Sequence, residues 1–551
     1  MAFLATAAVV LALQTSAPPV KASIEGVVVR AGTSEVIPRV RITIFRDDQP
    51  SGPIPDVMSD GQGRFIIKDL DAGSYNLQAE RNGFGRQPYG ERRPGRGGVP
   101  LTVRTGEKLK DVVFQLTPAG AIGGRVVDAT GEPLLGVNIG ILRAVYDENG
   151  KKTFTSITLV GQLLTRTDDR GEYRVFLLPP GRYYVQARPA PGLSNEPDVG
   201  YPITYYPGAT ESSGAAAIDL APGEELHTID FTLREQRLFR LRGRVIDPKT
   251  GRPPAAAYFE LIPRNSPEQV SHSSPDYDPT DGSFVMGKVP AGSYWLQARE
   301  TGFRNVAGAR IGTGDQSSRA GRIAVDVGNT DIDNLVIAFD PDVSIAGRIV
   351  LDDGSALENN PDVAKFVVRI QPKDSSNRSS PFPGRVKPGG TFAIENLQVG
   401  EYRVRLEPIS TKYYLKSVRL GQTDVSNDLV IAGPVQDELQ LVVASDAGEI
   451  NGTLVDKDRN PIGGAEVVVV PAQQGDRRGL SGYSVTNQKG QFGFCCIVPG
   501  DYKLFAWEDI EPPTGYRDPD ILRKYEELAT RVRVPAHGKQ TIELKVIPDN
   551  Q

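Results

Sequence analysis

Histidine, cysteine, methionine and tryptophan are scarce in this chain of 551 residues, which contains three His, two Cys, three Met and two Trp. The histidines, His227, His272 and His537, lie far apart in the sequence. A catalytic zinc site needs clustered His and acidic ligands around one open position, and no His-x-x-Glu or His-Glu-x-x-His motif occurs. The sequence therefore argues against a metallopeptidase, and we expect no cofactor.

The two cysteines, Cys495 and Cys496, are adjacent, so no disulfide can join distant parts of the chain. A disulfide between neighbouring residues is possible but strained, and two free thiols are the simpler expectation. Nucleophilic catalysis has no support either, because the sequence contains no Gly-x-Ser-x-Gly elbow. We therefore expect a protein that is not an enzyme.

The sequence also lacks a large excess of either charge and long apolar runs. A net charge of −5 on this length excludes a strongly basic nucleic-acid surface. The apolar run from Ala2 to Leu13 is shorter than the roughly 20 residues that cross a membrane, and no other stretch comes near that length. Small and polar residues follow at 14–17, as at a signal-peptidase site.

Residues 1–21 are therefore predicted to be a cleaved signal peptide, with a disordered or buried N-terminal segment as the alternative. The mature chain should lack a transmembrane segment. It should be secreted, to the periplasm or the cell surface.

Glycine and proline are abundant, with 59 and 43 residues. Both are unfavourable inside helices and favourable in turns, so this composition indicates many short strands joined by turns.

Two sequence patterns recur in the same order about every hundred residues. The first pattern is an Ile or Leu two residues before a glycine, followed by small apolar residues; its glycines are Gly26, Gly124, Gly243, Gly347 and Gly452. The second is Gly-x-Tyr before an alternating run; its tyrosines are Tyr75, Tyr183, Tyr294, Tyr402 and Tyr502. Such repetition is the signature of tandem modules.

Within each module, apolar and polar residues alternate, as in Val40, Ile42 and Ile44 with Arg41 and Thr43 between them. This period of two is typical of strands with one buried face. Between the two patterns, a Gly-containing turn is followed closely by an aromatic residue, which indicates a hairpin entering the core; these aromatics are Phe65, Tyr173, Phe284, Phe392 and Phe492.

A single sheet of this kind cannot hide its apolar face, so two sheets must pack together. The predicted fold is all-β: five tandem β-sandwiches with little helix. Their predicted bounds, which define modules 1 to 5, are 22–118, 119–236, 237–342, 343–446 and 447–551. Module 5 also carries a short helix, predicted over 520–529 from the spacing of its apolar residues.

The combined pattern, I-x-G-x-V-x-D, G-x-P, D-x-x-G-x-F and P-G-x-Y-x-L-x-A, resembles the carboxypeptidase regulatory-like domain. That domain is a transthyretin-like sandwich related to the B-type repeats of collagen adhesins, and tandem copies are found in secreted bacterial proteins. Module 2 matches best, with Gly131-Glu132-Pro133 and Pro180-Gly181-Arg182-Tyr183. The resemblance implies a non-catalytic accessory or surface domain, and the sandwich also resembles starch-binding modules.

Two loops after the Gly-x-Tyr strand are candidates for binding. The first, at 81–96, contains Phe84, Tyr89 and five arginines, and the second contains Tyr201, Tyr205 and Tyr206. Exposed aromatic rings stack on sugar rings while nearby polar groups bind the hydroxyls. These five aromatic residues are the predicted glycan contacts, although the same residues would also serve to cap the end of each sandwich.

Module 5 interrupts the pattern with a segment that follows Trp507. We predict that Trp507 packs against Ile521, Leu522 and Tyr525, with its indole N–H bonded to a backbone group, and so forms a structural lid.

The function favoured by these observations is a secreted, non-enzymatic, multi-module binding or spacer protein of the cell envelope. A glycan or an envelope protein is the expected partner, and nucleic acid is not. The alternative is an accessory chain that acts in trans with an extracellular hydrolase, such as a carboxypeptidase, or with an outer-membrane transporter.

Overall fold

The computed structural model describes residues 20–46, 55–91, 98–147, 150–157, 165–190, 193–194, 196, 198–266, 271–273, 275–300, 303–306, 309–312, 319–341, 343–353, 365–374, 376, 383–407, 413–472, 482–508, 510 and 514–548. Most of the predicted signal peptide, residues 1–19, and positions 92–97 of the first candidate loop lie outside these ranges. The chain divides into two compact units, one of Met1–Glu91 with Gly98–Pro118, the other of Arg92–Gly97 with Ala119–Gln551.

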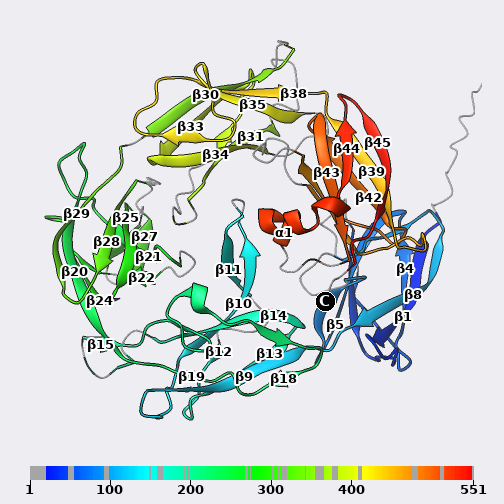
Figure 1. The fold of residues 1–551 in the computed structure, drawn as a ribbon, viewed down its shortest axis with the longest axis horizontal. Coiled ribbons are helices and arrows are strands. Elements are labelled where there is room, and N and C mark those ends of the chain that lie inside the picture. The colour runs from blue at the N-terminus through cyan, green and yellow to red at the C-terminus, as the bar shows by residue number, and fades with distance from the viewer. Residues whose placement is uncertain are drawn as a thin grey trace, which may run out of the picture. The chain divides into compact units, whose positions relative to one another are not determined.

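The described chain is almost entirely β, as predicted, and its strands form tandem sandwiches (Figure 1). Five large hydrophobic clusters form the cores, and each draws its buried residues from one stretch of the sequence: 22–116, 122–233, 239–339, 343–443 and 450–544. These stretches fall within the predicted modules, whose boundaries remain a prediction.

The first sheet of each sandwich is built around the Ile/Leu-x-Gly strand. That strand pairs antiparallel with the strand after the glycine turn and parallel with a strand near the module's end. In sheet order, the strands are β4 (Arg64–Leu70), β1 (Ala22–Arg30) and β8 (Lys108–Leu116) in module 1; β13 (Glu172–Leu178), β9 (Gly120–Val127) and β18 (Glu225–Leu226), with β19 (Phe231–Thr232) also on β9, in module 2; β20 (Gln236–Ile246), β24 (Ser283–Pro290) and β23 (Asp276–Tyr277), with β29 (Ile332–Ala338) on β20, in module 3; β33 (Thr391–Leu397), β30 (Val343–Leu351), β38 (Leu439–Ala444), β35 (Tyr414–Leu420) and β36 (Thr423–Asp424) in module 4; and β42 (Gln491–Ile497), β39 (Gly448–Val455) and β45 (Lys539–Lys545) in module 5. The short strand β15 (Val199–Gly200) of module 2 also pairs with the start of β20.

The second sheet is built around the Gly-x-Tyr strand. Its strands are β3 (Val57–Met58), β2 (Arg41–Arg46), β5 (Gly73–Arg81) and β6 (Gly85–Pro88), with β7 (Leu101–Val103) on β5, in module 1; β11 (Lys152–Ser156), β10 (Asn138–Tyr146), β14 (Gly181–Arg188) and β16 (Thr204–Tyr205), with β12 (Thr165–Arg166) on β10 and β17 (Ile218–Leu220) on β14, in module 2; β22 (Ser271–Ser273), β21 (Ala257–Pro263), β25 (Gly292–Glu300) and β28 (Ala320–Val327), beside the hairpin β26 (Phe303–Val306) and β27 (Ala309–Gly312), in module 3; β32 (Gly384–Arg385), β31 (Val367–Pro372), β34 (Gly400–Glu407) and β37 (Leu429–Ile431) in module 4; and β41 (Gly482–Val485), β40 (Glu466–Pro471), β43 (Gly500–Trp507) and β44 (Thr530–Val534) in module 5.

The repeated glycine of the first pattern is required by close packing. A Cβ added at Gly347 would lie 2.5 Å from the carbonyl oxygen of Leu439, on the parallel strand β38, and the other four copies are equally crowded against a backbone carbonyl. Any side chain at this position would push the parallel strand away, which explains why the glycine recurs.

The tyrosines and aromatic residues that the patterns place inside are buried, as predicted. Each Gly-x-Tyr hydroxyl also donates a hydrogen bond to the carbonyl four residues earlier: Tyr75 to Asp71, Tyr183 to Pro179, Tyr294 to Pro290, Tyr402 to Gln398 and Tyr502 to Val498. The turn glycines before the inward aromatics all have positive φ; they are Gly63, Gly171, Gly282, Gly390 and Gly490. The core of each module is therefore tied to its turns.

The helix of module 5 is shorter than predicted. It comprises α1 (Pro519–Lys524), followed by the 3-10 turn η5 (Glu526–Leu528), and Leu528 is exposed. Two further 3-10 turns among the described residues are η1 (Ser212–Gly214) and η4 (Gly515–Arg517). The Asp518 side chain caps α1 by accepting from the Asp520 N–H, while Tyr525 leaves helical geometry and ends it.

The Trp507 ring packs as predicted, but its indole N–H does not make the predicted hydrogen bond. The indole is 1 % exposed in a cluster with Ile521, Leu522 and Tyr525, and its ring is edge-on to that of Tyr525 at 5.7 Å. It also stacks on Phe505 at 5.3 Å. The expected backbone partner is wrong, because Nε1 is buried with no hydrogen-bond partner among the described residues. Apolar contact surrounds the indole where an acceptor was expected.

Candidate functional site

The first candidate loop is anchored at one end of the module 1 sandwich. Gln87 fixes it, donating from Nε2 to the carbonyls of Phe84 and Thr117 (2.6 Å each) and accepting from the Thr117 N–H at 2.9 Å. Phe84 and Tyr89 are half-buried against the module 1 core, and the Tyr89 ring meets Phe114 edge-on at 5.4 Å. Both rings therefore cap the core and leave part of their surface in solvent.

Two residues of the second loop have the same placement in module 2. Tyr201 and Tyr206 are half-buried against the core, and the Tyr206 ring meets Phe231 edge-on at 6.0 Å. Burial, together with the negative charge of Glu235, raises the pKa of Tyr201 to about 12.

Tyr205 lies elsewhere. It is fully buried in a separate cluster with Leu142, Ala144 and Tyr184, and Phe154 packs beside them. Lys152 donates to the Tyr184 hydroxyl at 3.2 Å and lies 5.0 Å from the centre of that ring. The five predicted contacts thus fall into three places, and Tyr205 presents no exposed ring face.

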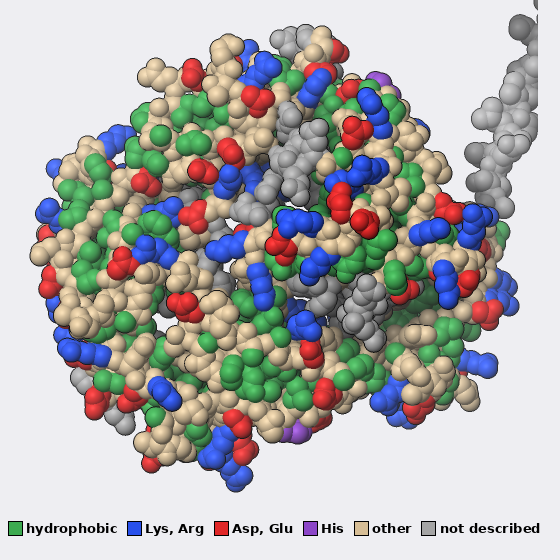
Figure 2. All heavy atoms as spheres, viewed as in Figure 1, with side chains coloured by type: hydrophobic (Ala, Val, Ile, Leu, Met, Phe, Trp, Pro, Cys, Tyr) green, Lys and Arg blue, Asp and Glu red, His purple; other side chains and the backbone are tan. Residues whose placement is uncertain are grey.

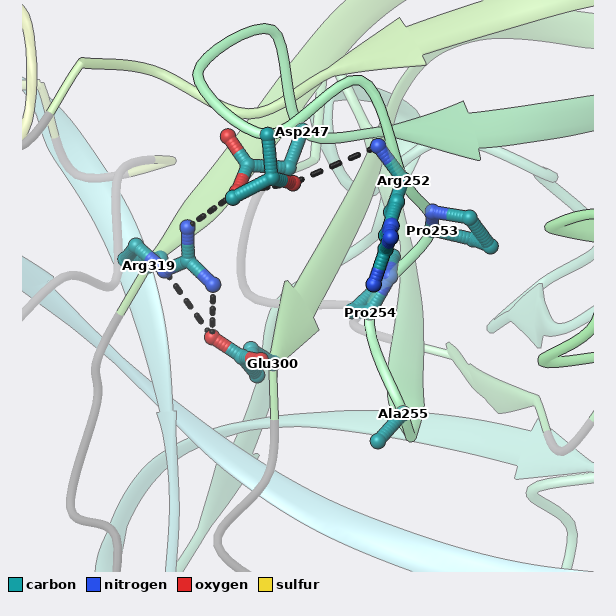
Figure 3. A pocket seen from close by; sticks show the side chains of 8 residues that line it. Asp247, Arg252, Pro253, Pro254, Ala255, Glu300 and Arg319 are labelled. Atoms are coloured by element: carbon teal, nitrogen blue, oxygen red, sulfur yellow. Dashed lines mark hydrogen bonds and ion pairs between the residues drawn. The ribbon is translucent and has the colours of Figure 1, made fainter.

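A polar pocket that sequence reasoning missed lies in module 3 (Figure 3). It has a volume of about 470 Å³ and is lined by Asp247, Thr250, Arg252, Pro253, Pro254, Ala255, Glu300 and Arg319. Asp247 follows β20, Glu300 ends β25 and Arg319 immediately precedes β28. The ends of three strands from both sheets therefore bring these charged groups together.

Arg319 joins the two carboxylates of the pocket. Its Nη1 lies 2.7 Å from Asp247 Oδ2, and its Nη2 and Nε lie 2.7 and 2.9 Å from Glu300 Oε2. Only 21 % of the Arg319 side chain, 6 % of Asp247 and 16 % of Glu300 are exposed. Burial opposes the ionisation of Asp247, but the bond from Arg319 and those from Lys249 and Thr250 outweigh it and hold its pKa below the ordinary value.

The same aspartate in modules 2 and 5 is only half-buried. Asp128 and Asp456 each close a turn by accepting backbone N–H groups two and four residues ahead. The module 3 turn is one residue longer before its proline, as Asp247 to Pro253 shows against Asp128 to Pro133. That extra residue is the one feature of the sequence that could have indicated a different arrangement around Asp247. Glu300 and Arg319 lie in a stretch without a repeated pattern, so nothing in the sequence joined them to Asp247.

The two cysteines lie at a bulge that every module repeats. Cys496 has φ of 63°, and Asp69, Leu177, Lys288 and Asn396 have the same left-handed geometry at the equivalent positions. The thiols are free, with their sulfurs 2.9 Å apart and Cys495 exposed. Burial, with the neighbouring Cys495, raises the pKa of Cys496 to about 12, so its thiol stays protonated and unreactive at neutral pH.

The described ranges contain neither a metal-binding cluster nor a membrane-spanning helix. There, no group of three or more His, Cys, Asp or Glu side chains could hold a metal ion, and no helix is long and apolar enough to cross a membrane. Basic and acidic side chains are interspersed over the face seen in Figure 2.

Residues 23–117 match the family model of the carboxypeptidase regulatory-like domain, which covers module 1. Three solved structures are similar to the chain at low identity. The TIE protein of Bacillus anthracis is 12 % identical over 93 % of this chain and 68 % of its own, with a TM-score of 0.15. The minor pilin of Streptococcus agalactiae is 16 % identical over 39 % of this chain and 96 % of its own, with a TM-score of 0.23.

The major pilin subunit of Bacillus cereus is 11 % identical over 58 % of this chain and 99 % of its own, with a TM-score of 0.14. Sequence identities and TM-scores this low do not show that the proteins are related. The fold is assigned from the sheets and hydrophobic cores described above. No curated protein matches the sequence.

Proposed function

We propose that this chain, whose first module matches the carboxypeptidase regulatory-like domain, is a secreted, non-enzymatic protein that binds or spaces partners at the cell envelope. The observation that carries the proposal is a repeated interior beneath unlike surfaces. On the Gly-x-Tyr strand, the residues that face away from the sandwich core are Asn76 and Gln78 in module 1, Tyr184 and Gln186 in module 2, Trp295 and Gln297 in module 3, Arg403 and Arg405 in module 4, and Lys503 and Phe505 in module 5. Tyr184, Gln186, Gln297 and Phe505 are nevertheless buried, whereas the other six are partly exposed. Modules that share a core and differ outside suit a binding array, since function depends on sites and not on the fold.

The proposed partner is a glycan, contacted by the half-buried rings at the ends of modules 1 and 2. Phe84 with Tyr89, and Tyr201 with Tyr206, are held in place by the core beneath them and reach solvent on the other side. Rings fixed in this way lose little conformational entropy when a sugar stacks on them. Tyr205, which is buried, would support Tyr206 and not the sugar directly.

The alternative is an accessory role in trans, beside an extracellular hydrolase or an outer-membrane transporter. The match of module 1 to a regulatory-like domain favours it. Under this alternative the same loops would contact a protein.

A glycan array probed with the chain from Ala22 onward tests the proposal. The variant Tyr201→Leu/Tyr206→Leu removes both ring faces while keeping apolar bulk against the core, and Phe84→Leu/Tyr89→Leu does the same in module 1. Phe176→Leu is the matched control, because Phe176 is an exposed aromatic residue of module 2 outside both loops. We expect specific glycan signals that a loop variant weakens and the control does not.

Signals unaffected by either loop variant would remove the loops from the account. A chain that binds no glycan but captures an envelope hydrolase or transporter would favour the alternative.

A further inference from the structure

We infer that the module 3 pocket is a binding site for a neutral saccharide (Figure 3). This inference rests on the proposed glycan-binding function and adds to it a module and a ligand class. Among the described residues, the lining of this pocket comes from module 3 alone, and neither candidate loop contributes to it.

The charged cluster is not needed to form the turn. Asp128 and Asp456 complete the equivalent turns without an arginine and are only half-buried. In module 3 the same carboxylate is 4 % exposed and bound to Arg319, which Glu300 also binds. Removing charges from water is costly and is often no gain over apolar packing, so stability alone is a weak reason to gather three charges here.

The charges of the pocket balance. Asp247 and Glu300 carry two negative charges, while Arg319 and Arg252 carry two positive charges. A charged ligand would leave one of these groups uncompensated, whereas a neutral ligand would not. Sugar hydroxyls both donate and accept, so they suit a wall that offers carboxylate oxygens beside guanidinium N–H groups.

The opposite wall is apolar. Pro253, Pro254 and Ala255 follow one another along the segment that faces the charged cluster in Figure 3. A pyranose ring has the same two-sided character, with an apolar C–H face and a rim of hydroxyls. The volume of about 470 Å³ falls in the range of small-ligand pockets.

Arg252 is the residue best suited to a test. Its side chain lines the pocket and is exposed, and the described contacts of this residue are made by its backbone, with Thr250 and Asp247. Arg252→Ala therefore removes a donor with little effect on the fold. Glu300→Gln keeps the shape of an acidic wall residue and removes its charge. Glu132→Ala is the matched control, because Glu132 holds the same turn position before the proline in module 2.

The experiment measures binding of cellobiose, maltose and N,N′-diacetylchitobiose to the chain from Ala22 onward by saturation-transfer NMR, with Kd from calorimetry. We expect at least one disaccharide to bind. Arg252→Ala and Glu300→Gln should each raise its Kd about tenfold, the effect of losing one charge-assisted hydrogen bond. Glu132→Ala should leave Kd unchanged, and the unfolding curves of Arg252→Ala and Glu132→Ala should coincide with that of the parent chain, whereas Glu300→Gln also loses its ion pair with Arg319 and is compared at a temperature at which it is folded.

Disaccharide binding that both pocket variants leave intact would overturn the inference and leave glycan binding by the loops in place. If no disaccharide binds while the glycan array gives loop-dependent signals, the pocket inference fails alone. If the array is also blank, the proposed glycan function fails with it.

Discussion

The hydroxyl of Tyr402 donates a 2.8 Å hydrogen bond to the carbonyl oxygen of Gln398, four residues earlier in the chain. The ring of Tyr402 is fully buried in the module 4 core, while its hydroxyl reaches the turn that precedes β34. The same bond occurs once in every module. One side chain thus fills the core and fixes the entry of its strand.

Two substitutions at Tyr402 should separate these roles. Tyr402→Phe keeps the ring and loses the bond, at a cost of about 1 kcal/mol, whereas Tyr402→Ala also opens a cavity and should cost about 3–5 kcal/mol. Hydrogen exchange followed by mass spectrometry should show the loss in module 4 peptides, with the other modules little changed because tandem units couple mainly to neighbours. Equal losses in all modules would contradict separate cores.

Trp507 should report a closed lid on module 5. In a Trp295→Phe variant Trp507 is the only indole, and we expect blue-shifted emission that iodide quenches poorly, because the ring is 1 % exposed. The Trp507→Phe chain supplies the comparison, since Trp295 is only partly buried and lies beneath Arg322 at 4.7 Å. Red-shifted, freely quenched emission from Trp507 would instead identify the segment as a binding loop with an exposed ring.

Acid should weaken module 3 through Asp247. Its folded pKa lies below the ordinary 3.8, so its contribution to stability is fully present above that value and is lost as the pH falls through the folded pKa. Asp247→Asn should therefore increase exchange of module 3 peptides at neutral pH, and the difference from the parent chain should shrink in acid. The control Asp276→Asn, at an exposed aspartate of the same module, should show no such trend.

A difference for Asp247→Asn that stays constant down to acid pH would mean that the carboxylate charge is not what Arg319 stabilises.

The sequence predicted the interior of the modules well because the interior repeats. Tyr402 and its four counterparts stand in a fixed pattern, and strand alternation with turn glycines leaves few other ways to bury them. The predicted helix over 520–529 is four residues longer than α1, which has six. The prediction included Leu528 because it fits helical spacing, but Leu528 is exposed at the end of a 3-10 turn.

The surface could not be predicted to the same degree. Tyr201, Tyr205 and Tyr206 are neighbours in a tyrosine-rich loop, and Tyr201 and Tyr206 pack against the module 2 core. Tyr205 instead packs in a separate apolar cluster with Leu142 and Tyr184. The pocket of module 3 depends on Arg319 reaching Asp247, a contact between residues 72 positions apart that follows no repeat. Contacts of this kind arise only once the strands are in place.

Limited proteolysis with mass spectrometry tests the central claim, that five modules fold around separate cores, most directly. The described segments between the last strand of one module and the first strand of the next are residues 117–119, 233–235, 339–341 and 445–447. A protease of broad specificity should cut there, and also at loop tips, and release fragments of roughly one hundred residues that remain resistant, as expected for single domains. A core that resists cleavage at all four segments, or early cuts within strands such as β9 and β30, would contradict the five-module account.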